Sequence, residues 1–162
     1  MLKAYGTGAL SLVLTALLGL SSAGCGAVLD GQHDTTVHFL VEPASGAFAG
    51  WSDITVDGDI SSVGTTTLWG ISLSVESPPE ADLSFLSTLV AQSNATTMAT
   101  LDSFPRGEQS ALMNIAYFDD LHPFFNGTST IRINWSGTIN PAFNAWPSTG
   151  IWMQADVKIN VQ

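Results

Sequence analysis

Residues 151–161, IWMQADVKINV, alternate strictly between two sets of side chains. The apolar set is Ile151, Met153, Ala155, Val157, Ile159 and Val161, and the intervening set is Trp152, Gln154, Asp156, Lys158 and Asn160. Successive side chains of a β-strand point to opposite faces, so this pattern predicts a strand with one buried face. Trp152 is out of phase with the apolar face and lies among residues that prefer water.

The same period of two recurs at residues 37–41, 67–75, 111–117 and 131–136. Weaker alternation predicts further strands at the segments 47–55, 87–92 and 97–102. Trp69 and Trp135 fall in phase with the apolar residues of their segments. We therefore predict that both rings lie in the core.

Turn residues separate these segments, among them Asp57-Gly58-Asp59 and Pro78-Pro79. No segment has the pattern of an amphipathic helix of normal length, although residues 80–86 and 119–125 could each form one helical turn. About eight short strands with this spacing predict an all-β domain over residues 35–162, built as an antiparallel β-sandwich. A small β-barrel is the alternative, because it also covers a sheet face and limits exposed edges.

The chain is poor in charge and strongly acidic. Only 11% of its 162 residues are charged, and 14 acidic residues against 4 basic ones give a net charge of −10. A nucleic-acid-binding protein needs a basic surface to neutralise phosphates, so this balance excludes that class. The balance also disfavours anionic membrane surfaces as partners. Hydrophobic residues make up 45% of the chain, which argues against disorder.

The first 24 residues have the order of a secretory signal peptide. Lys3 gives a positive start, residues 9–20 (ALSLVLTALLGL) carry no charge, and small residues follow at 21–24. The apolar segment is too short to span a bilayer, which takes about 20 residues. Cys25, the one cysteine of the chain, comes directly after it.

The boundary Ser22-Ala23-Gly24-Cys25 resembles the lipobox of bacterial lipoproteins, with Ser22 at the position that is usually Leu. The resemblance implies cleavage before Cys25, a diacylglyceryl group on its thiol and an acyl chain on the new amino terminus. Residues 25–34 would then be a lipid-anchored tether, and no other cofactor is expected. Gly26 stands where an Asp would indicate retention at the inner membrane, so the resemblance favours the outer membrane. An ordinary secretory signal cut near Ala23 is the alternative.

Two short segments, ADLSFL at 81–86 and DLHPF at 120–124, carry a second resemblance. With the strand pattern, they make the chain resemble the immunoglobulin-like and fibronectin-like sandwiches of cell surfaces. They also resemble small bacterial lipoproteins with one such domain. The resemblance implies a sandwich and leaves the function open, because a fold does not determine a function.

Catalytic candidates are few. The Gly-x-Ser-x-Gly motif of α/β-hydrolases is absent from the sequence. His122 closely follows two carboxylates, Asp119 and Asp120, which could orient it or form a metal site with it. The alternative, which we favour, is a polar turn in which an aspartate caps the helical turn at Pro123. A glycosidase pair would have to face each other, whereas adjacent strand residues point apart.

Asp53, Asp57 and Asp59 crowd one strand and turn, DITVDGD, and calcium prefers such oxygen ligands. Their spacing does not match the EF-hand loop, and a β-turn explains Asp57-Gly58-Asp59 without a metal. Zinc is not expected, because the one cysteine would carry lipid and the histidines are scattered. We therefore predict no metal site and keep these three aspartates as a weak calcium candidate.

Five tryptophans are many for a chain of this length. We predict that Trp152 and the loop from Phe143 to Trp146 form one exposed patch, because they are close in sequence. Exposed rings beside Asn and Asp can stack on sugars or anchor a protein partner. The alternative is that these rings serve only in packing.

The sequence therefore predicts a non-enzymatic, lipid-anchored envelope protein that binds or scaffolds a glycan or a protein at the membrane surface. The alternative is an envelope hydrolase, carbohydrate-active or other, that uses surface carboxylates.

Overall fold

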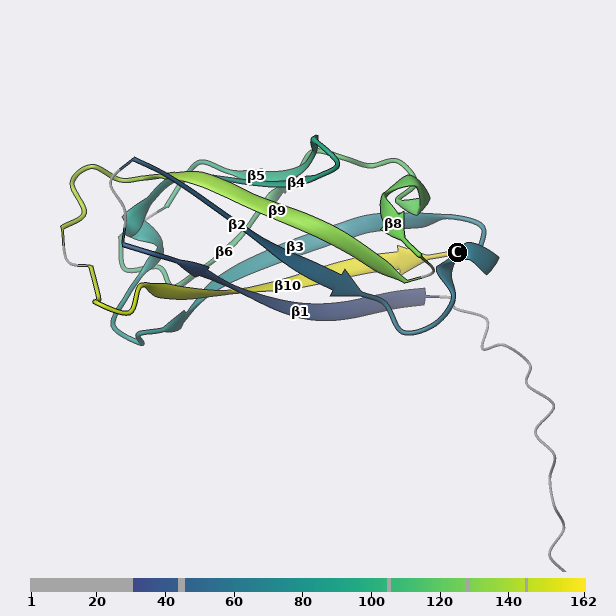
Figure 1. The fold of residues 1–162 in the computed structure, drawn as a ribbon, viewed down its shortest axis with the longest axis horizontal. Helices are drawn as coiled ribbons and strands as arrows, with labels where there is room; N and C mark the ends of the chain where they lie inside the picture. Colours follow the sequence, from purple (N-terminus) through teal and green to yellow (C-terminus); the bar gives the residue numbers. More distant parts are fainter. Residues whose placement is uncertain (1–30, 44–45, 105, 128, 145) are drawn as a thin grey trace, which may run out of the picture.

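The computed structural model describes residues 31–43, 46–104, 106–127, 129–144 and 146–162, which form two antiparallel β-sheets (Figure 1). The strands are β1 (Gly31–Val41), β2 (Ala47–Thr55), β3 (Thr66–Ser77), β4 (Leu86–Ser93), β5 (Thr96–Leu101), β6 (Ser110–Leu112), β7 (Asn114–Ile115), β8 (Phe125–Asn126), β9 (Thr130–Ile139) and β10 (Ile151–Val161). Three single turns of 3-10 helix accompany them, η1 (Ile60–Ser62), η2 (Leu83–Phe85) and η3 (His122–Phe124). The turns predicted at 80–86 and 119–125 are confirmed as η2 and η3. The described residues contain no helical segment with the length and apolar character that crossing a membrane takes.

The chain passes repeatedly between two sheets, and β4 and β5 form a hairpin within one of them. One sheet has the order β1-β10-β3-β6, and the other has the order β2-β9-β4-β5-β7, with β8 paired to β9. The predicted antiparallel β-sandwich is confirmed. In immunoglobulin-like sandwiches the first two strands are neighbours in one sheet, whereas β1 and β2 lie in different sheets here. The eight strands other than β7 and β8 have jelly-roll connectivity, in which the chain passes repeatedly between two four-stranded sheets.

The core lies between the two sheets, and β10 supplies six of its side chains. Every apolar residue of its alternating pattern is buried, as predicted, from Ile151 to Val161. Burial of each large apolar side chain contributes about 1.5–3 kcal/mol. The opposite sheet supplies Trp135 of β9, whose fully buried ring stacks on Phe39 of β1 with centroids 4.7 Å apart. The prediction for Trp135 is therefore confirmed.

Trp69 does not lie in the core, contrary to the prediction. Its ring is 67% exposed. Lys158 of β10 pairs with Gly70 and Ile159 pairs with Leu68, so Trp69 is the extra residue of a β-bulge in β3. A bulge places two residues opposite one and shifts the alternation of faces. Leu68 is therefore buried, and Trp69 turns outward instead of joining the core.

The segment predicted as one strand at 111–117 is divided between the two sheets. Residues Ser110–Leu112 pair with β3 in the first sheet, and Asn114–Ile115 pair with β5 in the second. Met113, which is buried, lies at the crossing. Both halves keep their odd-numbered residues toward the core, so the alternation in the sequence does not reveal the change of sheet.

Residues 31–34, which were predicted as part of a tether, belong to β1, which begins at Gly31. Residues 31–34 pair with β10 through their backbone, Gly31 opposite Val161 and Asp34 opposite Lys158. This end of β1 is polar on both faces, so no apolar alternation marks it as a strand. Residues 25–30, with Cys25, lie outside the described residues.

The sandwich has two ends, which we name by one residue each. The Gly31 end carries the start of β1, the end of β10, η1 and η3 (Figure 1, right). The Pro78 end carries the loops that follow β3, β5 and β9 (Figure 1, left). The eleven residues of β10 run between these ends, a distance of about 35 Å at roughly 3.3 Å per residue.

Candidate binding cleft

A cleft of about 640 Å³ opens at the Pro78 end. Its walls come from three loops: Pro78 to Ser84 after β3, Phe104 and Arg106 after β5, and Asn140 to Pro147 after β9. The volume lies within the range of about 300–1,000 Å³ that is typical of small-ligand sites. These loops are far apart in the sequence, and the jelly-roll connectivity brings them together.

Asp82 fixes the first wall to the second. One of its carboxylate oxygens accepts a 2.9 Å hydrogen bond from the backbone N–H of Ser84 and another from the Ser84 hydroxyl, which caps η2. Its other oxygen accepts a 2.7 Å bond from the backbone N–H of Gly107. The Ser84 hydroxyl, followed by these backbone donors, lowers the pKa of Asp82. Asp82 is therefore an ionised group that holds two loops together.

Asn140 fixes the third wall to the first. Its side-chain N–H donates a 2.9 Å hydrogen bond to the backbone carbonyl of Ser84, and its backbone N–H donates one of 2.8 Å to Phe85. Its side-chain oxygen accepts a 3.0 Å bond from the backbone N–H of Ala142. The cleft is thus shaped by hydrogen bonds between the protein's own groups.

Two aromatic rings that line the cleft pack on a buried third ring. Phe85 is fully buried, and the rings of Phe143 and Trp146 lie 5.9 and 5.7 Å from it between centroids. Phe143 and Trp146 meet edge to face at 5.3 Å. Both rings are half-buried. Part of each ring therefore serves in packing, as the alternative prediction expects. Each still lines the cleft with its remaining surface.

Three further polar side chains line the cleft. Glu80, Arg106 and Asn144 are exposed, and their side chains form no hydrogen bond within the described residues. They offer a carboxylate, a guanidinium and an amide beside aromatic surface. Such a combination can fix a ligand that has both apolar faces and hydrogen-bonding groups.

Trp152 lines a separate hollow of about 340 Å³ on the outer face of the first sheet, together with His38, Glu76 and Ser77. Its ring is 43% exposed, so its predicted place on the outer face is confirmed. The single patch predicted for Trp152 and the 143–146 loop is not what the structure shows. The two hollows are separate, although Ser77 lines one and Pro78 the other.

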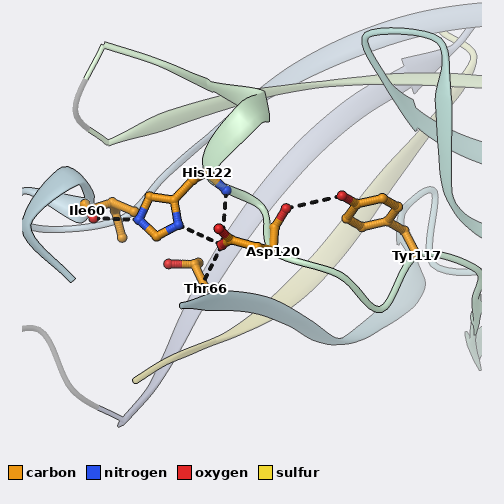
Figure 2. Close-up of polar contacts among 5 residues, drawn as sticks. All are labelled: Ile60, Thr66, Tyr117, Asp120 and His122. Carbon is orange, nitrogen blue, oxygen red and sulfur yellow. Dashed lines mark hydrogen bonds and ion pairs between the residues drawn. The ribbon is translucent and has the colours of Figure 1, made fainter. Parts of the chain in front are cut away.

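The carboxylate and histidine cluster at the Gly31 end is a structural tie (Figure 2). Asp120 accepts a 2.6 Å hydrogen bond from Nδ1 of His122, a 3.0 Å bond from the backbone N–H of Thr66 and a 3.3 Å bond from that of His122. The hydroxyl of Tyr117 donates to the backbone carbonyl of Asp120 at 3.1 Å. The favoured interpretation of a polar turn agrees with this geometry, because Asp120 binds the backbone two residues on. The predicted aspartate cap is wrong, since Leu121 is the N-cap of η3 and no side chain caps it.

Both ring nitrogens of His122 are hydrogen-bonded within the protein, so neither is available to a substrate. Its Nε2 donates a 2.9 Å hydrogen bond to the backbone carbonyl of Ile60, so both ring nitrogens face acceptors. The hydrogen bond with Asp120 raises the pKa of His122 above its ordinary value of 6.5. Burial alone would raise the pKa of Asp120, but the bonds from His122 and Thr66 hold it below 3.8. With an acceptor at each ring nitrogen, the geometry suits a tie between an imidazolium and a carboxylate better than a general base.

The three aspartates of the calcium candidate do not gather around one point. Asp53 lies on the outer face of β2, where it accepts two hydrogen bonds from Arg132 at 2.8 and 2.9 Å. Arg132 lowers the pKa of Asp53 through this pairing and also lies 4.2 Å above the ring of Trp51. Within the described ranges, no group of three His, Cys, Asp or Glu side chains could hold a metal ion.

Sequence reasoning found Phe143 and Trp146 but missed Glu80, Phe104 and Arg106. Their segments were recognisable only as turns, since Pro78-Pro79 and Pro105-Arg106-Gly107 have turn chemistry. Cys25 lies outside the described residues, so its lipidation remains a prediction.

In comparisons with known proteins, no family model, no curated protein and no solved structure matches this chain.

Proposed function

We propose that this protein is a lipid-anchored protein of the cell envelope that binds a neutral glycan in the cleft at the Pro78 end, without catalysis. The observation that carries the proposal is the composition of that cleft. It combines half-buried rings, Phe143 and Trp146, with the exposed polar side chains of Glu80, Arg106 and Asn144.

The position of the cleft supports the anchored part of the proposal. Gly31 lies six residues after Cys25 in the sequence, so a lipid on Cys25 keeps the Gly31 end within about 20 Å of the bilayer. The cleft is at the opposite end of the sandwich. An anchor at Cys25 therefore leaves the cleft open, away from the membrane.

Charge and ring chemistry support a neutral glycan as the ligand. With a net charge of −10, the protein repels polyanions, and Glu80 and Asp82 outnumber Arg106 in the cleft. The rings of Phe143 and Trp146 offer apolar surface for the C–H faces of a sugar. The carboxylate, guanidinium and amide offer acceptors and donors for its hydroxyl groups.

The lowered pKa of Asp82, the carboxylate that ties two walls of the cleft together, favours binding over hydrolysis. A glycosidase needs a general acid whose pKa is raised. The hydrogen bonds from Ser84 and Gly107 shift the pKa of Asp82 the other way. Asp119 and Asp120, the pair of the alternative, lie at the Gly31 end, where Asp120 is part of the tie with His122.

Isothermal titration with neutral oligosaccharides tests the binding part of the proposal. We expect the protein, extracted in detergent, to bind at least one oligosaccharide, and the affinity to fall at least tenfold in Trp146→Ala, a loss of about 1.4 kcal/mol. Because Trp146 packs on Phe85, Arg106→Ala serves as a second variant that leaves the core intact. Trp51→Ala, which removes an exposed ring from the outer face of β2, is the matched control. Equal affinities in all three variants and the unaltered protein would contradict the proposal.

Membrane fractionation tests the anchor. The unaltered protein is expected in the membrane fraction, and Cys25→Ser is expected in the soluble fraction or as unprocessed precursor, since one or more acyl chains supply the attachment. A Cys25→Ser variant that pellets with membranes at the mature mass would refute lipidation at this residue.

A further inference from the structure

We infer that the cleft and the Trp152 hollow are two parts of one extended site, which takes a linear neutral oligosaccharide of several units. The inference rests on the proposed glycan binding and deepens it, because it assigns the hollow to the same ligand.

The two separate hollows are lined by consecutive residues. Ser77 lines the Trp152 hollow and Pro78 lines the cleft. Ser77 is also the register partner of Trp152 across β3 and β10. Trp146 of the cleft and Trp152 of the hollow are also only six residues apart in the sequence. A chain-like ligand that leaves the cleft over Pro78 therefore reaches Trp152 next.

A second β-bulge shapes the hollow. Trp152 pairs with Ser77 and Met153 pairs with Val75, so Glu76 is the extra residue on β3. Glu76 and Ser77, although adjacent in the sequence, consequently both line the hollow beside Trp152. The bulge thus places a carboxylate and a hydroxyl next to one exposed ring.

His38 and Glu76 give the hollow its polar groups. Nδ1 of His38 and Oε2 of Glu76 lie 2.8 Å apart, and each side chain is 44% exposed. This contact is the one hydrogen bond that the two side chains make within the described residues, which leaves Nε2 of His38 and Oε1 of Glu76 for a ligand. The Trp152 hollow therefore repeats the chemistry of the cleft, an aromatic ring beside hydrogen-bonding groups.

Linkage of two sites by one ligand has a measurable consequence. When two binding modules share a ligand, the second contact becomes intramolecular and the affinity rises without any new type of contact. A short oligosaccharide fills only the cleft, and a longer one also reaches Trp152. The affinity is therefore expected to rise with the number of sugar units.

The charges of the combined site favour a neutral ligand over a polyanion. Glu76, Glu80 and Asp82 stand against Arg106, so a polyanion is repelled along the whole length. A basic peptide is the rival of different chemistry, and the experiment below includes it as an outcome.

The test is a titration of the full chain in detergent with β-1,4-linked glucose and N-acetylglucosamine oligomers of two to six units. We expect the six-unit oligomer of one series to bind at least tenfold more tightly than its two-unit oligomer. Trp152→Ala should remove that gain and leave two-unit binding unchanged, and Glu76→Gln should reduce the gain. Trp69→Ala, which removes an exposed ring elsewhere on β3, should change neither affinity.

The outcomes separate this inference from the proposal it rests on. If two-unit binding depends on Trp146 but affinity does not rise with length, or Trp152→Ala retains the full gain, the extended site is refuted and glycan binding stands. If neither series binds, both are refuted. Binding of an oligolysine peptide that depends on Trp152, in place of the oligosaccharides, also overturns the inference.

Discussion

The indole N–H of Trp135 donates a 2.7 Å hydrogen bond to the hydroxyl of Ser52, and both residues are buried. Ser52 lies on β2 and Trp135 on the neighbouring strand β9, while the stacked partner of the Trp135 ring, Phe39, belongs to the opposite sheet. The same ring thus joins two strands by a hydrogen bond and two sheets by stacking. The largest side chain of the core is held in one orientation by these two contacts.

Ser52→Ala should therefore destabilise the protein. The substitution leaves the buried indole N–H without an acceptor, which costs about 1–3 kcal/mol. The free energy of unfolding from urea denaturation measures the effect. Ser72→Ala, on the outer face of β3, is the matched control and should change stability by less than about 0.5 kcal/mol. Equal stabilities of the two variants would show that the Ser52 contact contributes nothing.

Gly137→Ala should be more damaging than the same change at Gly50. A Cβ at Gly137 would collide with the backbone carbonyl of Thr88 and lie 2.7 Å from the Phe48 ring, whereas one at Gly50 meets nothing within 4 Å. Both glycines lie in adjacent strands of one sheet, so the backbone environment is matched. We expect Gly137→Ala to lower stability by about 1–3 kcal/mol, as overpacking does. The idea fails if thermal unfolding shows the two variants to be alike.

Val157→Asp should unfold the domain. Val157 is buried in the middle of β10, and an unpaired buried charge costs several kcal/mol against a total stability of about 5–15 kcal/mol. Asn160→Asp, on the outer face of the same strand, introduces the same side chain without burial in the core and should leave the circular dichroism spectrum native. A native spectrum for Val157→Asp would mean that the buried face of β10 is misassigned.

The tie between His122 and Asp120 should make stability depend on pH. The pKa of His122 is raised in the folded state, so its contribution is complete below about pH 6.5 and is lost as the pH rises through the folded value. The pKa of Asp120 is lowered, so its contribution is present above about pH 3.8 and is lost as the pH falls through the folded value. We expect the melting temperature to be higher at pH 6 than at pH 8.5.

His122→Gln isolates this effect from other titrating groups. The variant should lose stability at pH 6 and show a smaller difference between pH 6 and pH 8.5 than the unaltered protein. If the two proteins show parallel profiles across this interval, His122 does not carry the pH dependence.

The sequence was sufficient for the regular part of the fold. β10, β9 and the inner residues of β1 were predicted because a strand with one buried face imposes a period of two on its residues. The errors arose where that period is interrupted or unmarked. The bulge at Trp69 shifts the alternation of buried and exposed residues in β3. At Met113 the alternation continues although the chain changes sheet. The start of β1 is polar on both faces and therefore has no apolar alternation.

The cleft was only partly predictable for a different reason. Phe143 and Trp146 attracted attention as aromatic residues in a loop rich in Asn and Pro. Glu80 and Arg106 carry no local signal, because their place in the cleft depends on which loops the strand order brings to one end. Sequence periodicity constrains the faces of strands and leaves their order in the sheets open.

The most direct measurement of the central claim is the shift of the five tryptophan indole N–H signals in a nitrogen–proton spectrum of the labelled protein. The five rings lie in the cleft (Trp146), in the adjoining hollow (Trp152), in the core (Trp135), on the outer face of β2 (Trp51) and at the bulge of β3 (Trp69). On titration with the tightest-binding neutral oligosaccharide, we predict that the Trp146 signal shifts, joined by Trp152 when the oligomer is long, while the other three stay in place. A spectrum in which Trp51 or Trp69 shifts and Trp146 does not would contradict glycan binding in the cleft.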